Sequence, residues 1–142
     1  MIIVTGAAGF IASALVARLN ELRYFDLVLV DDFSREDRKV NYENKRYRQL
    51  LDRNLLFDFI EKNENQIDFI FHLGARTDTT EFNAEVFEKW NVSYSKRVWE
   101  LCTAFAIPMV YASSAATYGN GELGYDDNHN IIPSLQPLNP YG

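Results

Sequence analysis

MIIVTGAAGFIAS, residues 1–13, is the stretch that decides the fold. Its apolar residues 2–4 predict a short buried strand, and the spacing Gly6-x-x-Gly9 predicts a tight turn that opens a helix. Positions without a Cβ let backbone N–H groups approach a phosphate closely. Ala12 stands where a third glycine is usual and still permits close packing of the helix on the strand. The order of strand, glycine turn and helix therefore indicates a dinucleotide site.

The composition is typical of one globular domain: 142 residues, 47% hydrophobic and 24% charged. The net charge of −6 argues against a nucleic-acid binder, which would be basic. The single cysteine, Cys102, excludes an internal disulfide and favours a reducing compartment. No apolar run reaches membrane-spanning length and no leader precedes the first strand, so we expect a cytoplasmic protein without membrane contact. We expect no metal site.

Apolar runs alternate with helical periodicity along the chain. Strands are predicted at residues 2–4, 26–31, 47–50, 67–73 and 106–112, with helices after Gly9 and over residues 55–60 and 83–105. This alternation predicts a doubly wound parallel α/β domain of the Rossmann type. Ligands of such sheets bind beyond the carboxyl ends of the strands.

The end of the second strand carries the residues that bear on the cofactor. Asp31 can accept hydrogen bonds from an adenosine ribose, which favours NAD. Arg35 and Arg38 follow in a basic stretch, residues 33–53, and an arginine at this place accommodates the 2′-phosphate of NADP. These residues alone leave the choice between NAD and NADP open.

Polar residues also follow the fourth strand. We expect His72 to be a hydrogen-bonded structural residue, because a catalytic role needs a partner that the sequence does not show. The polar loop RTDTTE, residues 76–81, is predicted to cover the cofactor. The aromatic stripe of the helix over residues 83–105 predicts packing, and Asn91 and Lys96 are expected at its surface.

Several segments carry a resemblance to a known family. TGAAGFIAS, FHLGA, YASSAATYG and PLNPYG resemble the extended short-chain dehydrogenase/reductase superfamily of nucleotide-sugar epimerases and dehydratases. Within it, RTDTTEF, NVSYSK and YASSAATYG are similar to the ADP-heptose 6-epimerases. The resemblance runs along the whole chain and is weakest over residues 33–66.

The resemblance implies an isomerase that acts on a small ADP-sugar. It would oxidise an ADP-linked heptose at one carbon, transfer the hydride to NADP and return it to the other face, in lipopolysaccharide core biosynthesis. Implied cofactor contacts come from Gly6, Gly9, Phe10, Ile11, Asp31, Asp32, Arg38, Arg53, Leu73, Gly74, Ala75, Arg76, Thr77 and Asn91. Implied substrate contacts come from Thr79, Thr80, Glu81 and Ser114. The family also forms homo-oligomers.

Ser114 and Tyr141 are the catalytic residues that the resemblance implies. A free tyrosine has a pKa of about 10, which a nearby ammonium and the cationic nicotinamide would lower. Ser114 would hold the sugar oxygen. The family's lysine and its smaller substrate domain lie beyond residues 1–142, so we expect a fragment that binds cofactor weakly and does not turn over.

Two alternatives stay open. One is another epimerase or dehydratase of the superfamily, against which RTDTTEF favours the heptose enzymes. The other is a non-catalytic dinucleotide-binding module, which the absent lysine favours and which Ser114 and Tyr141 oppose. Without the resemblance, strand-end hydrogen bonding explains Ser114 and loop packing explains Tyr141 equally well. The resemblance alone favours NADP over NAD.

Overall fold

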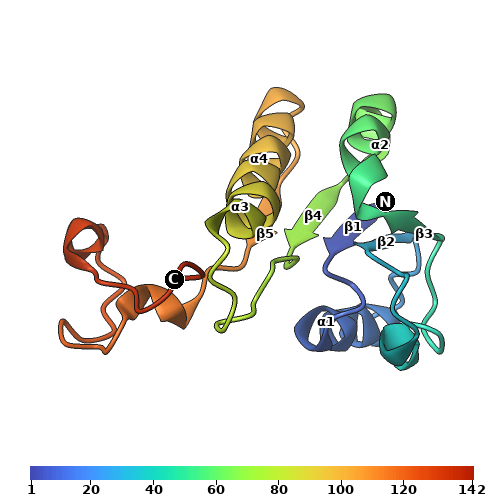
Figure 1. Ribbon diagram of the computed structural model, residues 1–142. Helices are drawn as coiled ribbons and strands as arrows, with labels where there is room; N and C mark the ends of the chain where they lie inside the picture. Colours follow the sequence, from blue (N-terminus) through green and yellow to red (C-terminus); the bar gives the residue numbers. More distant parts are fainter. The chain divides into compact units, whose positions relative to one another are not determined.

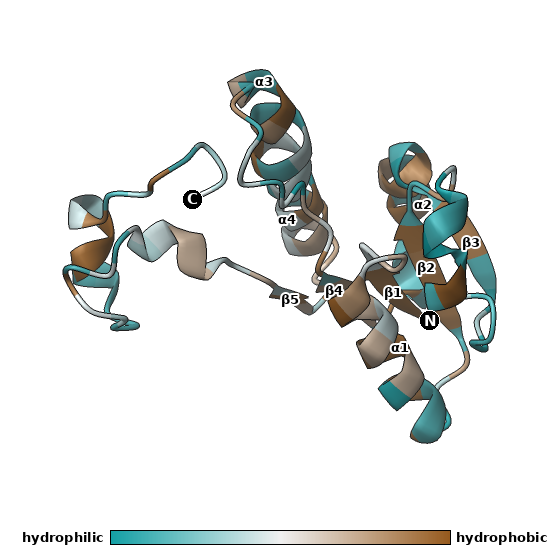
Figure 2. Ribbon diagram, turned by 60° about the horizontal axis from the view of Figure 1, so that its bottom comes forward, coloured by the Kyte–Doolittle hydropathy of each residue, from teal (hydrophilic) through white to brown (hydrophobic).

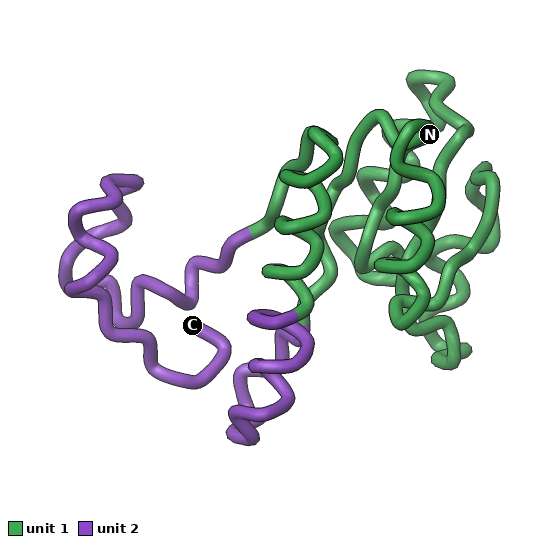
Figure 3. The backbone as a smooth tube through the Cα atoms, turned by 90° about the horizontal axis from the view of Figure 1, so that it is seen from above, with its two compact units in different colours: residues 1–75, 94–112 green, residues 76–93, 113–142 purple.

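The computed structural model describes all residues 1–142, and the chain divides into two compact units (Figure 3). Unit 1 comprises residues 1–75 and 94–112, and unit 2 comprises residues 76–93 and 113–142. The strands and longer helices of unit 1 are β1 (Ile2–Thr5), α1 (Phe10–Glu21), β2 (Leu27–Asp31), β3 (Gln49–Asp52), α2 (Leu56–Asn63), β4 (Phe69–His72), α4 (Tyr94–Ala104) and β5 (Met109–Tyr111). None of the helices is long and apolar enough to span a bilayer.

Unit 1 is built on a parallel sheet with the strand order β3-β2-β1-β4-β5. Helices α2 and α4 cover one face of the sheet and α1 covers the other (Figure 1). The predicted doubly wound α/β fold is thus confirmed. Because all the strands are parallel, their carboxyl ends meet at one edge, where β1 places Thr5 beside His72 of β4.

Two apolar cores lie on the opposite faces of this sheet. Successive strand residues point to opposite faces, so the side chain of Ile3 joins the core under α2 and α4 while that of Val4 joins the core under α1. Figure 2 shows hydrophobic colouring on the central strands. Strands buried on both faces explain the near-continuous apolar runs of the sequence.

The third strand lies two residues further along the chain than predicted, at Gln49–Asp52 instead of 47–50. Its register is set by pairing with β2, which places Asp52 beside Asp31. Residues of β3 alternate between half-buried and exposed, as expected for an edge strand. Tyr47 instead packs against the core under α1.

The single helix predicted over residues 83–105 is interrupted. It consists of α3 (Ala84–Phe87), a π-helical segment (Glu88–Ser93) and α4. The hydroxyl of Ser93 donates a 2.7 Å hydrogen bond to the Glu88 carboxylate five residues earlier. The boundary between the two units follows this segment. The remainder of unit 2 is mostly turns with short 3₁₀ helices at Ala115–Tyr118 and His129–Ser134, consistent with the lack of periodicity in the sequence.

Candidate functional site

The glycine turn after β1 is held tightly against the end of β4. Gly6 has φ +68°, a left-handed conformation that favours glycine. A Cβ on Gly6 would lie 2.7 Å from the Cα of Gly74, closer than such atoms can approach. Gly6 therefore needs to be glycine for both its backbone angle and the close approach, while a Cβ on Gly74 would be crowded, 3.0 Å from the nitrogen of Gly6.

Side chains from distant parts of unit 1 fix the peptide groups of Ala8. Its N–H donates to the Asp31 carboxylate at 2.8 Å, and its carbonyl accepts from the amide of Asn41 at 2.8 Å. The turn is closed by a 2.8 Å hydrogen bond from the N–H of Gly9 to the carbonyl of Gly6. The loop is therefore held in its conformation by hydrogen bonds within unit 1.

The N-terminus of α1 has the features of an anion site. Gly9, its N-cap residue, has no side chain to accept the free N–H groups of the first turn, and that turn contains no acidic residue. Phe10 and Ile11 are 85% and 72% exposed. The free N–H groups and the positive end of the helix dipole suit a pyrophosphate. The residues present thus fit the diphosphate of a dinucleotide.

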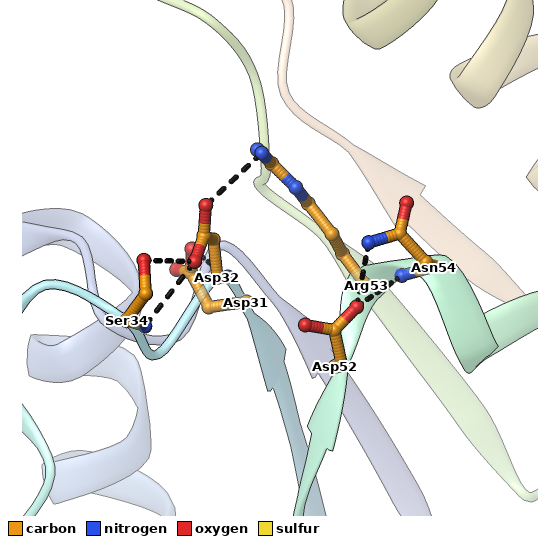
Figure 4. Close-up of polar contacts among 6 residues, drawn as sticks. All are labelled: Asp31, Asp32, Ser34, Asp52, Arg53 and Asn54. Carbon is orange, nitrogen blue, oxygen red and sulfur yellow. Dashed lines mark hydrogen bonds and ion pairs between the residues drawn. The ribbon is translucent and has the colours of Figure 1, made fainter.

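A charged cluster lies at the carboxyl ends of β2 and β3 (Figure 4). The carboxylate of Asp32 accepts from the hydroxyl and the N–H of Ser34, at 2.6 and 3.2 Å, and pairs with Arg53 at 3.2 Å. The hydrogen bonds from Ser34, and then the charges of Arg53 and Arg38, hold the pKa of Asp32 below its ordinary value. Asp32 is therefore anionic at neutral pH.

The two neighbouring acids have different surroundings. Asp31 accepts N–H groups with both carboxylate oxygens, from Ala8 and from Asp32 at 2.7 Å, so it orients the turn. Arg53 is anchored in turn, because the hydroxyl of Tyr94 in α4 donates to its carbonyl at 2.8 Å. The sheet thus brings the glycine turn, both acids and Arg53 to one edge.

The residues after β4 complete this edge. Leu73 packs against the core under α1. The N–H of Gly74 donates to the hydroxyl of Thr5 at 3.0 Å, and Ala75 ends this part of unit 1. His72 is buried and hydrogen bonded at both ring nitrogens, as expected for a structural histidine.

The polar loop after Ala75 belongs to unit 2, where Asn91 holds it. The side-chain amide of Asn91 accepts from the N–H of Arg76 at 2.7 Å and donates to its carbonyl at 2.9 Å. Asn91 thus lies near the surface, as expected, and its amide also holds the backbone of Arg76. Further along the loop, Asp78 accepts from the hydroxyl of Thr80 at 2.6 Å.

The other predicted residues of unit 2 differ in what surrounds them. Thr77 and Thr79 are exposed, and Glu81 accepts from the N–H of Asn83 at 2.8 Å. Ser114 accepts from the N–H of Ala116 at 3.1 Å and so caps a 3₁₀ helix. The ring of Tyr141 lies 6.3 Å from that of Phe87, centroid to centroid.

Three residues that support the site were missed by sequence reasoning. Asn41 and Ser34 lie in the basic stretch of residues 33–53, and Tyr94 lies in the aromatic stripe for which only packing was predicted. Their partners are up to 41 residues away along the chain. No spacing pattern connects such partners, although the serine two residues after an aspartate is typical of a local turn.

The sequence is similar to known enzymes along its whole length. The profile of the family described as NAD dependent epimerase/dehydratase matches residues 2–142. The ADP-L-glycero-D-manno-heptose-6-epimerase of Fusobacterium nucleatum is 41% identical over 146 residues, which cover 100% of this chain and 44% of that protein. The enzyme of the same name from Nitratidesulfovibrio vulgaris is 40% identical, covering 100% and 45%. The chain thus spans less than half the length of the curated relatives it matches.

The solved structures similar to this chain also include epimerases. The ADP-L-glycero-D-manno-heptose-6-epimerase of Helicobacter pylori superposes with a TM-score of 0.76 at 27% identity, over 99% of this chain and 46% of that one. The UDP-glucuronic acid 4-epimerase of Bacillus cereus in complex with NAD also gives 0.76, at 26% identity, over 99% and 47%. Because the family profile matches nearly every residue, this chain belongs to the NAD dependent epimerase/dehydratase family.

Proposed function

We propose that this chain is the cofactor-binding domain of an epimerase that interconverts ADP-D-glycero-D-manno-heptose and ADP-L-glycero-D-manno-heptose. The observation that carries the proposal is the 40–41% identity, over the whole chain, to enzymes of that name. In this proposal the substrate domain corresponds to the part of the relatives that this chain does not span. The full protein would act as a cytoplasmic homo-oligomer in lipopolysaccharide core biosynthesis.

A nicotinamide dinucleotide is the cofactor in this proposal, supported by the family description and by the NAD bound to a structural neighbour. When bound, it supplies a hydride acceptor that can return the hydride. The N–H groups at the start of α1 would hold its pyrophosphate, and Asp32 lies at the strand end where Rossmann folds bind the adenosine ribose. Leu73, Gly74 and Ala75 would line its path.

We further propose that the cofactor is NADP. Arg53 pairs with Asp32, and Arg38 is close enough to lower the pKa of the same carboxyl. A 2′-phosphate on the ribose would offer both guanidinium groups a stronger partner than the carboxylate. Arg53→Gln should then weaken NADP binding about tenfold and NAD binding little. Arg18→Gln, in an exposed pair on α1, is the matched control.

The proposed chemistry assigns proton transfer to unit 2. Ser114 uses its hydroxyl oxygen as an acceptor for the N–H of Ala116, so its own hydrogen is available to a substrate oxygen. Tyr141 would take the proton of the carbinol as a general base. Thr79, Thr80 and Glu81 would contact the sugar nucleotide, and Asn91 would act by fixing the loop that carries them.

A fusion protein tests the activity and substrate directly. Residues 1–142 are joined to the remaining part of the Fusobacterium nucleatum enzyme and assayed with ADP-heptose, UDP-glucose and UDP-glucuronic acid. We expect epimerisation of ADP-heptose alone, abolished by Tyr141→Phe. Activity only on a UDP-sugar would refute the heptose assignment, and binding of neither NADP nor NAD by residues 1–142 would refute the cofactor site.

A further inference from the structure

His72 is a buried polar residue that the proposed chemistry does not use. Its side chain is 1% exposed at the end of β4. Nδ1 lies 2.8 Å from the hydroxyl of Thr5 in β1, and Nε2 lies 2.9 Å from the hydroxyl of Ser95 in α4. The rings of Tyr94 and Tyr111 lie 6.0 and 6.1 Å from the imidazole, both 23° from parallel to it. The imidazole is therefore fixed on several sides.

The direction of these hydrogen bonds depends on which ring nitrogen carries the proton. The oxygen of Thr5 accepts the N–H of Gly74 at 3.0 Å, and its single hydrogen can be donated to Nδ1 of His72. We assign the tautomer in which Nδ1 accepts from Thr5, so that the ring proton lies on Nε2 and is donated to Ser95. This arrangement needs a neutral ring, and burial lowers the pKa of His72 to about 4.

The Thr5 hydroxyl stands at the point where the glycine turn meets β4. A Cβ on Gly74 would lie 3.0 Å from the nitrogen of Gly6 and 3.1 Å from the Thr5 hydroxyl. The Thr5 hydroxyl, as the acceptor of the Gly74 N–H, is therefore one of the groups that hold Gly74 at the turn. In the assigned tautomer the direction of this hydroxyl is set by Nδ1 of His72, because the hydroxyl hydrogen points at it.

We propose that His72 is a positioning residue that holds the cofactor turn against the end of β4 through the hydroxyl of Thr5. The inference rests on the proposed role of the turn in cofactor binding. In this proposal His72 acts only through Thr5 and contacts neither cofactor nor substrate. Its Ser95 bond fixes the ring, and its Thr5 bond does the positioning.

Two substitutions separate the two ring nitrogens. His72→Asn places a side-chain oxygen near the position of Nδ1 and keeps an acceptor for Thr5, whereas His72→Gln reaches the position of Nε2 and keeps only a partner for Ser95. We expect His72→Gln to raise the dissociation constant for NADP about tenfold, and His72→Asn to raise it less than about threefold. Circular dichroism and thermal unfolding verify that both variants are folded.

Thr5 supplies a coupling test that a merely structural role would not pass. In a Thr5→Val background the hydroxyl is gone, so His72→Gln should cause no further loss of NADP affinity. Losses that add independently would overturn the inference. Equal losses in His72→Asn and His72→Gln would also overturn it.

Amide hydrogen exchange of Gly74 gives a readout that needs no cofactor. His72→Gln should accelerate exchange of this N–H by roughly threefold to tenfold, because its acceptor is no longer oriented, while His72→Asn should not. Unchanged exchange in His72→Gln would overturn the inference. If the unsubstituted chain bound neither NADP nor NAD, the proposed function would fail, and the exchange rates would still decide the role of His72.

Discussion

Replacing Gly6 with alanine tests whether the turn is as tight as its geometry indicates. Gly6 has φ +68°, and a residue with a Cβ loses about 1–2 kcal/mol in this conformation. The new Cβ would lie 2.7 Å from Cα and 2.9 Å from N of Gly74, and the backbone shift that relieves this overlap costs about 1–3 kcal/mol. Gly6→Ala should therefore lower the free energy of unfolding by about 2–5 kcal/mol, out of roughly 5–15 kcal/mol for a typical domain.

Gly9→Ala is the matched control in the same turn. Gly9 has φ −84°, and its Cβ would meet only the carbonyl oxygen of Gly6, at 3.0 Å. In urea unfolding followed by circular dichroism, the midpoint of Gly6→Ala should fall by roughly 1 M or more, and that of Gly9→Ala by less than half as much. Nearly equal midpoints would refute the argument that the approach of Gly6 to Gly74 fixes the turn.

Three further predictions concern other contacts. Burial lowers the pKa of His72 from 6.5 to about 4. Between these pH values the unfolded chain binds more protons than the folded chain, so the free energy of unfolding should fall as the pH falls below 6.5, by up to about 3 kcal/mol. Urea midpoints from pH 7.5 to 4.5 measure this loss, and an equal fall in His72→Asn would contradict it. Asn41→Ala removes the bond to the Ala8 carbonyl and should lower the free energy of unfolding by about 1 kcal/mol, against no more than about 0.5 kcal/mol for the exposed Asn65→Ala. Asn91→Ala removes both bonds to Arg76 and should accelerate proteolysis within residues 76–83 several-fold, with Asn91→Asp intermediate because it keeps the acceptor; unchanged cleavage in both variants would count against the clamp.

The sequence was sufficient to predict the centre of the sheet and the glycine turn. Strands β1 and β2 are buried on both faces, so their apolar runs mark them clearly. The edge strand β3 was predicted two residues early, because its short alternating pattern over Gln49–Asp52 is a weak local signal. Its place follows from pairing with β2, which no local pattern encodes.

The interruption of the long helix could not be predicted from the spacing of its apolar residues. Phe87, Trp90, Tyr94 and Val98 recur at spacings of three and four, which an α-helix satisfies. A π-helical segment lengthens the turn without a change in composition, and such segments often occur at functional sites. Asn91 lies in this segment, and its amide holds the backbone of Arg76, a contact that the sequence did not predict.

The candidate residues of the two units differ in what holds them, and this bears on how the proposed function divides. In unit 1 the turn is fixed by partners far along the chain: Asp31 and Asn41 lie 23 and 33 residues from Ala8, and Thr5 lies 69 residues from Gly74. These long-range partners tie the turn to the rest of unit 1, so we expect the turn to unfold together with unit 1. In unit 2 the side-chain oxygen of Ser114 accepts a hydrogen bond from the N–H of Ala116, only two residues away. Such a turn sets the direction of the hydroxyl but leaves its place to other contacts. Under the proposed function, cofactor affinity should therefore follow the stability of unit 1, and catalysis should follow the stability of unit 2.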